Sequence, residues 1–423
     1  MNHALEMFDE MVKNPAIGKA ALMQKALALA LVGDYEGAAR ILGGEEGTLE
    51  LNRAGIIAYA QVLSQLERNP DAVDLIDKAF PDTADPELIT LRAELAAGKP
   101  VPFTAVTGAR DALAQLFFEV GRSLLDGRDP GLVLIYTRLA QYLNPEHAGA
   151  ALVTAEVFKK LGKDDLAAEA YAQVPQTDRN YPTAQLGRAS ALRRMGKVDE
   201  ALATLEALAK FRPDLPAVEA AIGDTYRFEK RYAEAIPHYD AAIGLFKEPA
   251  PAQWRTYFSR AICYERTGQW PQAEADFRKA LELFPDQPSV LNYLGYSYVE
   301  RREHLDEALD MIRRAVAARP TDGYIRDSLG WVYYRLGRYD EAVDELERAV
   351  ELKPLDPILN DHFGDALWAV GRKREAEFQW RRALSFITDD TDLEELNPDR
   401  IRRKLEVGLD KVLEEEGGEP IQK

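Results

Sequence analysis

The stretch GRYDEAVDELERAVELKPLDP, residues 337–357, decides the fold of this chain. Ala342, Leu346 and Ala349 are separated by four and three residues, which places all three on one face of a helix. The two alanines let a neighbouring backbone approach, and the leucine fills the space between them. Pro354 follows the last apolar position and ends the helix. The stretch therefore predicts a helix that packs closely against a partner along one narrow face.

The same pattern recurs along the chain, which has 423 residues. The first alanine returns with steps of 34, 34, 38, 35, 34 and 34 residues at Ala167, Ala201, Ala235, Ala273, Ala308, Ala342 and Ala376. An earlier series with the same spacing comprises Ala4, Ala38 and Ala72. Four residues after each alanine stands a large apolar side chain, such as Tyr239, Ile312 or Trp380. A fixed period of this length is typical of repeat architectures.

A second helix precedes each of these helices. Its apolar stripe is clearest at Leu291, Leu294, Gly295 and Tyr298, where the glycine permits a close helix crossing. A turn with glycine, such as Gly337-Arg-Tyr, separates the two helices. Neither helix buries its stripe alone, so the hairpins must stack to form a core. Clear units begin near residues 148, 182, 216, 254, 288, 323 and 357, and a weaker unit begins near 114.

Residues 337–357, together with GQWPQAEADFRKALELFPDQP at 268–288, closely resemble the tetratricopeptide repeat (TPR). The resemblance implies an all-α fold, a right-handed TPR superhelix that is an α-solenoid of antiparallel helix pairs. It also implies that the first helix of each pair lines the concave surface. Asn397, Pro398 and Asp399 predict the start of a C-terminal capping helix, with its apolar stripe at Ile401, Leu405, Leu409 and Val412.

The periodicity divides the chain into five segments. Residues 1–80 hold TPR-like units, the first of them incomplete, and residues 81–113 form an irregular joint. The main array covers 114–388, the capping helix 389–413 and a disordered tail 414–423. The first unit lacks its first helix. Either the N-terminus forms a bespoke cap or, as we expect, the sequence is a fragment of a longer array.

Composition excludes several classes of protein. The formal charge is −18, with 53 basic and 71 acidic residues, so nucleic acid and anionic lipid are poor partners. No apolar run approaches the length of about 18 residues that a transmembrane helix needs, so we expect no direct membrane insertion. The single cysteine, Cys263, excludes an intrachain disulfide, and a lone buried thiol is compatible with either the cytoplasm or the periplasm.

The sequence shows no catalytic constellation. It has no phosphate-binding glycine loop, zinc-protease helix or nucleophile elbow, and its five histidines lie in separate repeats without metal-ligand spacing. We therefore expect a binding protein that has no catalytic residues, no metal and no cofactor. An enzyme with its site in residues 98–112 is the weakest alternative, because Lys99, Thr104, Thr107, Arg110 and Asp111 offer no base–nucleophile pair.

Repeat positions 2, 5, 9 and 12 should point into the concave groove. In the last three units, this rule selects a set rich in aromatic, Asn and Asp side chains for binding a peptide or protein: Asn292, Tyr296, Tyr324, Asp327, Trp331, Tyr334, Asp361, Asp365 and Trp368. Aromatic side chains beside hydrogen-bonding groups suit an extended peptide or a partner helix. The alternative is that Trp331, Tyr334 and Trp368 wedge adjacent helices together.

Earlier repeats place basic residues at the corresponding positions. They are Arg122, Lys159, Arg193, Arg227 and Arg255. Each is compatible with ordinary solvated charge, but a row of them predicts a basic groove that receives acidic side chains or a carboxylate terminus. The TPR clamp for a terminal carboxylate has a Lys and an Asn four residues apart on successive first helices. This chain lacks that arrangement, so that specificity is not expected.

Residues 253–384 resemble more closely a group of proteobacterial TPR proteins, through stretches such as VLNYLGYSYVERREHLDEAL at 290–309. Members of that group carry an export signal, and some are outer-membrane lipoproteins. One branch is similar to an adaptor that brings substrates to a carboxyl-terminal processing protease. The resemblance implies a non-enzymatic scaffold or adaptor, periplasmic or outer-membrane-associated, with that protease and its substrates as partners. The alternative is a cytoplasmic TPR scaffold or chaperone-like cofactor.

Overall fold

The computed structural model describes residues 2–14, 18–47, 49–81, 86–125, 127, 129–388, 391 and 396–417. Within these ranges the secondary structure is helical, with twenty-four α-helices, one short 3-10 helix and no strand. The chain divides into two compact units, Met1–Pro213 (unit 1) and Asp214–Lys423 (unit 2). This boundary falls inside the main array that the sequence placed at 114–388.

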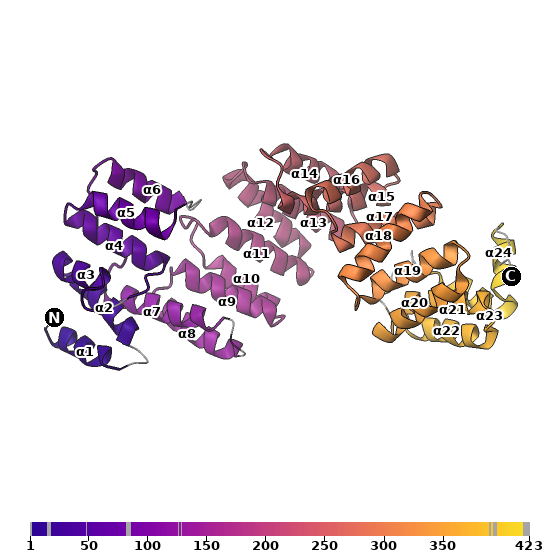
Figure 1. Ribbon diagram of the computed structural model, residues 1–423, viewed down its shortest axis with the longest axis horizontal. Coiled ribbons are helices and arrows are strands. Elements are labelled where there is room, and N and C mark those ends of the chain that lie inside the picture. Colours follow the sequence, from indigo (N-terminus) through magenta and orange to yellow (C-terminus); the bar gives the residue numbers. More distant parts are fainter. Residues whose placement is uncertain are drawn as a thin grey trace. The chain divides into compact units, whose positions relative to one another are not determined.

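Unit 1 contains the first twelve helices. They are α1 (Asn2–Val12), α2 (Gly18–Leu31), α3 (Tyr35–Leu42), α4 (Arg53–Gln65), α5 (Asn69–Ala79), α6 (Pro86–Ala96), α7 (Ala109–Ser123), α8 (Pro130–Leu143), α9 (Ala148–Lys160), α10 (Asp164–Ala172), α11 (Tyr181–Arg194) and α12 (Val198–Phe211). Consecutive helices pack against each other in chain order, except that α7 packs on α2 and not on α6 (Figure 1).

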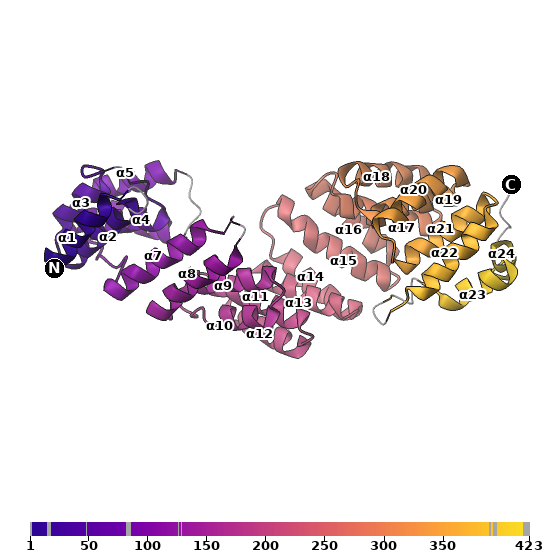
Figure 2. The same cartoon turned by 90° about the horizontal axis from the view of Figure 1, so that it is seen from below.

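Unit 2 contains the remaining helices. They are α13 (Pro216–Phe228), α14 (Tyr232–Gly244), the 3-10 helix Pro251–Gln253, α15 (Trp254–Arg266), α16 (Trp270–Leu283), α17 (Pro288–Arg301), α18 (Leu305–Ala318), α19 (Gly323–Arg335), α20 (Tyr339–Leu352), α21 (Pro357–Ala369), α22 (Lys373–Ser385), α23 (Pro398–Val407) and α24 (Leu409–Glu415). Its hairpins pair α13 with α14, α15 with α16, and so on to α21 with α22 (Figure 2).

The predicted fold class, an all-α solenoid of antiparallel helix pairs, is confirmed. First helices begin at 148, 181, 216, 254, 288, 323 and 357, within one residue of the starts that the repeat spacing predicts. Only the weak unit differs, because α7 begins at Ala109. Gly268 and Gly337 end their helices with φ of +75° and +73°, a conformation that glycine adopts without steric strain.

Close contact between a glycine and a large side chain sets the packing of the hairpins in unit 2. A Cβ added at Gly330 would lie 2.5 Å from Cγ of Leu346, and one at Gly295 would lie 2.8 Å from Cγ1 of Ile312. Both large side chains, and Ala342 next to Leu346, are fully buried. In α13, α17, α19 and α21 a large side chain of the following helix fills the space left by a glycine, whereas α15 has the buried Ala261 at this position.

The irregular segment after α6 packs back on α4. The Gln61 side chain accepts hydrogen bonds from the backbone N–H of Thr104 and donates to its Oγ1, and Ser64 Oγ accepts from the N–H of Val101. At the end of the segment, Asp111 accepts from Thr107. Hydrogen bonds therefore hold the connecting segment against α4 at one end and against the start of α7 at the other.

The C-terminal cap is two helices where the sequence predicted one. Asn397 is the N-cap of α23, as predicted, and its side chain accepts a hydrogen bond from the N–H of Arg400. Gly408 then has φ of +84° and divides α23 from α24. Because α24 continues to Glu415, the segment predicted as a disordered tail begins as helix, and residues 418–423 lie outside the described residues.

Candidate functional site

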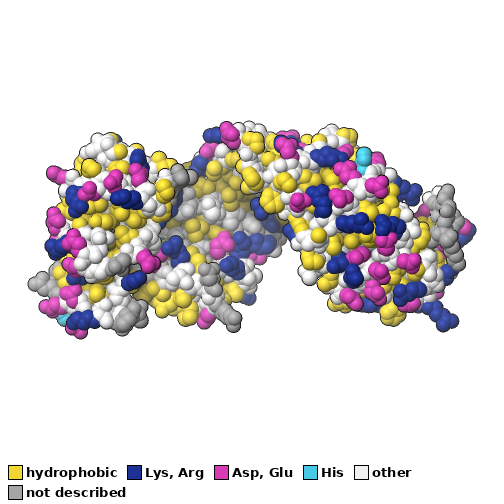
Figure 3. Space-filling model, in the orientation of Figure 1, with side chains coloured by type: hydrophobic (Ala, Val, Ile, Leu, Met, Phe, Trp, Pro, Cys, Tyr) yellow, Lys and Arg dark blue, Asp and Glu magenta, His cyan; other side chains and the backbone are white. Residues whose placement is uncertain are grey.

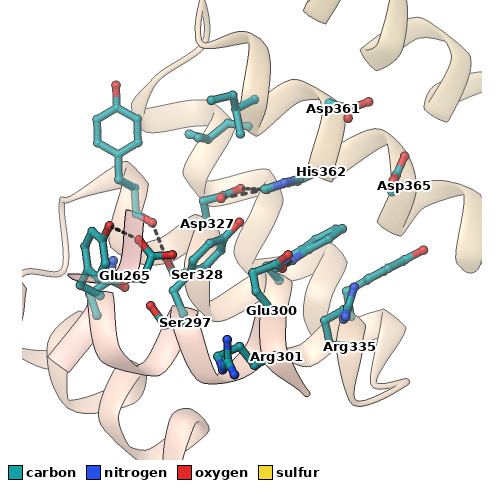
Figure 4. A pocket seen from close by; sticks show the side chains of 18 of the residues that line it. Glu265, Ser297, Glu300, Arg301, Asp327, Ser328, Arg335, Asp361, His362 and Asp365 are labelled. Carbon is teal, nitrogen blue, oxygen red and sulfur yellow. Dashed lines mark hydrogen bonds and ion pairs between the residues drawn. The ribbon is translucent and has the colours of Figure 1, made fainter. Parts of the chain in front are cut away.

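Unit 2 has a groove of about 710 Å³ along its stacked first helices. Helices α15, α17, α19 and α21 supply most of its lining, and Asn397, Arg400 and Leu413 of the cap close one end (Figure 4). Of the predicted aromatic-set residues, those that line the groove are Asn292, Tyr296, Tyr324, Asp327, Trp331, Tyr334, Asp361 and Asp365. The repeat-position rule therefore brings together residues from three successive hairpins.

A stack of three rings forms the floor of this groove. The Trp331 ring lies 4.1 Å from that of His362 at 15° and 4.9 Å from that of Tyr334 at 8°. The indole Nε1 of Trp331 donates to Glu300 Oε1 at 2.7 Å. Trp331 is half-buried, so it joins α17, α19 and α21 and still presents part of its ring to the groove. Tyr324 is 51% exposed.

His362 is held by an ion pair beneath the stack. Its Nδ1 lies 2.9 Å and 3.1 Å from the two carboxylate oxygens of Asp327 on the neighbouring first helix. Burial alone lowers the pKa of His362, but the charge and hydrogen bond of Asp327 raise it, and two further carboxylates bring the pKa to about 9. The imidazole is therefore charged at neutral pH and fixes the plane on which the Trp331 indole lies.

Two polar groups of the groove have no partner among the described residues. Asn292 Oδ1 is buried without a hydrogen bond, and the Arg335 guanidinium, also in the lining, forms no ion pair within the described ranges. A buried acceptor without a donor destabilises the folded state unless a ligand supplies one. Turned toward the groove, the Asn292 amide can accept from a backbone N–H, and Arg335 can donate to a carboxylate.

Asp361 and Asp365, predicted as ligand contacts, are already occupied by the cap. Lys404 Nζ lies 2.8 Å from Asp361 Oδ1 and 2.6 Å from Asp365 Oδ1, and its side chain is fully buried. Burial raises the pKa of Asp361, and the charge of Lys404 opposes that rise. Lys404 stands between Ile401 and Leu405 of the apolar stripe, and nothing in the sequence pattern predicts its burial.

Trp368 is not part of the groove lining, contrary to its predicted place. Its Nε1 donates to Asp410 Oδ2 at 3.0 Å, and its ring lies 5.4 Å from that of Trp380. A Cβ at Gly408 would lie 2.6 Å from the Trp368 ring. Trp368 lies on α21, the first helix of the last hairpin, so the cap covers it in place of a following hairpin. Trp368 therefore wedges adjacent helices together, which was the alternative to ligand binding.

The predicted basic residues are distributed over both units, and none of them lines the groove of unit 2. Arg122 pairs with Glu119 at 2.9 Å within α7, and Lys159 pairs with Glu156 at 3.2 Å within α9. Both pairs are exposed. In unit 2, Arg227 contacts Asp224 and the Tyr239 hydroxyl, and the Arg255 guanidinium lies 5.2 Å from the Trp254 ring centroid. Arg193 also has an interaction partner.

The buried thiol and the carboxylates form no metal-binding arrangement. No group of three or more His, Cys, Asp or Glu residues in the described part of the chain is placed to hold a metal ion. Burial raises the pKa of Cys263 to about 12, so the thiolate that acts as nucleophile or ligand is scarce at neutral pH. Among the described helices, none is both long and apolar enough to cross a membrane.

Comparisons with known proteins identify the repeats. Models of the tetratricopeptide repeat match residues 183–214, 214–286 and 289–357. A chain in the crystal structure of the APC/C hetero-tetramer Cut9–Hcn1 superposes with a TM-score of 0.51 at 16% identity, over 92% of this chain and 83% of that one. The chain therefore carries tetratricopeptide repeats and has the TPR solenoid fold.

The curated relatives match over part of their length. A TPR repeat-containing protein of Pseudomonas aeruginosa, PA4667, is 31% identical over 181 residues, which cover 41% of this chain and 28% of that protein. The Hsp70-Hsp90 organizing protein of Triticum aestivum is 31% identical over 137 residues, covering 32% of this chain and 21% of that protein. The chain thus spans less than a third of either relative.

Proposed function

We propose that this chain is a non-enzymatic adaptor that binds an extended segment of a partner protein in the groove of unit 2. The observation that carries the proposal is the combination of an open aromatic floor with two polar groups that lack partners. Trp331 and Tyr324 offer apolar surface to side chains of the segment, and Asn292 and Arg335 lie in the same groove. TPR repeats are protein-interaction scaffolds, which agrees with this use.

The groove supports recognition of main chain and side chains together. When the Asn292 amide turns toward the groove, its Oδ1 accepts a backbone N–H of the bound segment, which removes the unsatisfied buried acceptor, and aromatic rings cover apolar side chains at little entropic expense. Arg335 selects a carboxylate through a charge-assisted hydrogen bond. The His362–Asp327 pair holds the Trp331 ring in place before binding, so little ordering is needed when the segment arrives.

Selection from a random dodecapeptide library on the full chain tests the proposal. The affinities of the selected peptides are then measured for the unaltered chain, for Tyr324→Ala and for Phe378→Ala. Phe378 is a matched control, since it is an aromatic residue 58% exposed on α22 and not part of the groove. We expect Tyr324→Ala to weaken binding about tenfold and Phe378→Ala to leave it unchanged. Failure to enrich any peptide, or equal effects of both variants, would contradict the proposal.

We further propose that the adaptor works in the periplasm, or at the outer membrane, and recruits substrates to a carboxyl-terminal processing protease. The resemblance of residues 253–384 to exported proteobacterial TPR proteins supports this assignment. Fractionation of the source cell with antibody detection tests the compartment, and chemical cross-linking in the envelope tests the protease. Recovery with cytoplasmic markers would contradict this assignment and leave the groove proposal standing.

A chaperone-like cofactor is the second candidate, and the similarity to the Hsp70-Hsp90 organizing protein of wheat favours it. A cofactor of that kind would use the terminal-carboxylate recognition for which this chain lacks the Lys and Asn pattern. Comparing each selected peptide with its C-terminally amidated form distinguishes the two candidates. The adaptor proposal predicts that amidation changes the affinity less than twofold, and a loss of tenfold or more would favour the chaperone cofactor.

A further inference from the structure

Helix α8 of unit 1, PGLVLIYTRLAQYL, carries apolar side chains on both its inner and its outer face. Its inner face, which comprises Val133, Thr137, Ala140 and Gln141, is buried in the hairpin with α7 and against α9. Arg138 is the one charged residue of the helix. A helix that is apolar all round is typical of a buried position. The outer face of α8, however, is uncovered.

Four large apolar side chains form a stripe along that outer face, which we call the α8 stripe: Leu132, Ile135, Leu139 and Tyr142. They are 43%, 55%, 39% and 75% exposed, respectively. Their spacings of three, four and three residues are those of the a and d positions of a coiled-coil heptad. In Figure 3, hydrophobic side chains gather along the lower edge of the molecule, in the region that Figure 1 labels α8.

The α8 stripe is unusual within the described part of the chain. No other described helix carries more than two exposed large apolar side chains. Isolated exposed apolar residues are normal on a protein surface, whereas a contiguous patch marks an interaction site. Because α8 belongs to unit 1 and the groove is formed by unit 2 alone, the stripe is a separate surface from the peptide groove.

We propose that the α8 stripe docks an amphipathic helix of a partner protein, which places its own a and d residues against the stripe and an acidic residue opposite Arg138. The spacing of three and four residues gives a narrow apolar face of helical period, and a second helix with the same spacing packs against such a face side by side. Arg138 is exposed, occupies a g position beside Leu139 and forms no ion pair with any described residue. An acidic flank on the partner complements it.

A second copy of the chain fits this face poorly. The midpoint of the stripe lies next to Arg138, so a two-fold pair of α8 helices would bring the two Arg138 side chains together near the axis. Like charges at that place disfavour self-pairing. An anionic lipid surface would require a wider basic flank than Arg138 and Arg110, the latter bonded to the Tyr142 carbonyl, and Arg122 is already paired with Glu119.

The proposal is tested with the full chain and two synthetic 21-residue helical peptides. Both peptides carry Leu at a and d, and they differ only in having Glu or Lys at e and g, so their like charges hinder self-pairing. Fluorescence anisotropy gives their affinities for the unaltered chain, Leu139→Asp, Arg138→Glu and the control Phe378→Asp. Since all three positions are exposed, circular dichroism should show unchanged helicity.

We expect the Glu peptide to bind at least tenfold more tightly than the Lys peptide, Leu139→Asp to weaken it at least tenfold, and Arg138→Glu to reverse the charge preference. Phe378→Asp should have no effect. No binding of the Glu peptide, or an equal loss with Phe378→Asp, overturns the proposal. It is also overturned if the unaltered chain sediments as a dimer that Leu139→Asp dissociates, or if the stripe binds anionic vesicles and neither peptide.

Discussion

Lys404 donates a hydrogen bond of 2.6 Å to Asp365 although the lysine side chain is fully buried. The same ammonium also contacts Asp361 at 2.8 Å. Arg400 lies 3.5 Å from the other oxygen of Asp365 and pairs with Glu416. The cap is thus fastened to the last hairpin by buried charge, at the end of the groove in unit 2.

Removal of this buried cation should loosen the cap. Lys404→Met removes the hydrogen-bond partner of the buried Asp361 and leaves Asp365 with only Trp380 and Arg400, so we expect the free energy of unfolding of unit 2 to fall by about 3–5 kcal/mol. The triple variant Lys404→Met, Asp361→Asn, Asp365→Asn removes the uncompensated charges and should recover most of that loss. Urea denaturation measures both variants, and limited proteolysis after residue 396 reports on the cap. Equal midpoints for the unaltered chain and Lys404→Met would contradict the role of the cluster.

The raised pKa of His362 predicts a loss of stability in mild alkali. Its pKa rises from 6.5 to about 9 on folding. Below pH 6.5 both states hold the proton and the stabilisation is complete, and it declines as pH rises toward and through 9. We expect a decrease of about 3 kcal/mol across this window. Urea denaturation at several pH values measures it, and His362→Gln should show no such decline.

The notch at Gly330 predicts sensitivity to a single methyl group. Gly330→Ala would place Cβ 2.5 Å from Leu346 Cγ and should lower the free energy of unfolding by about 1–3 kcal/mol. Gly244 of α14 has no neighbour within 4 Å of the equivalent Cβ, so Gly244→Ala should raise stability by about 0.5–1 kcal/mol. Thermal denaturation measures the melting temperature of both variants. If both substitutions shift the melting temperature in the same direction, the close helix crossing at Gly330 is contradicted.

Asn292 should separate stability from binding. Its Oδ1 is buried without a hydrogen bond, so Asn292→Leu removes an unsatisfied acceptor and should leave the melting temperature unchanged or raised. The same substitution removes the acceptor for the backbone of the bound segment, and should weaken selected peptides about tenfold. A variant that binds as well as the unaltered chain would exclude Asn292 from recognition.

The repeat spacing was sufficient to predict the fold, because the same small and large residues recur at each helix crossing. Gly295 against Ile312 shows why, since the contact depends on two residues a fixed distance apart along the chain. The break at Gly408 was missed because the apolar positions Ile401, Leu405, Leu409 and Val412 keep helical spacing across it. The spacing of apolar residues shows which face of a helix is buried. It does not show that Gly408, inside this series, has a positive φ that interrupts the helix.

The groove was predicted in part, for a similar reason. Repeat position places Tyr296 and Trp331 on the concave face, and these lie there. The element that covers a groove position is the one that follows its hairpin. For Tyr296 and Trp331 this is another hairpin, whereas for Trp368 it is the cap. The charge of His362 and the burial of Lys404 depend on partners 35 to 43 residues away, Asp327 and Asp361, for which the sequence carries no periodic signal.

Photo-cross-linking tests the central claim, that unit 2 binds an extended segment in its groove, most directly. Tyr324 in the groove and Phe378 outside it are each replaced by p-benzoylphenylalanine, and the tightest selected peptide is irradiated with each protein. Mass spectrometry then locates the adduct. The account predicts a cross-linked peptide from position 324 and none from position 378. Cross-linking from position 378 with none from 324 would contradict it.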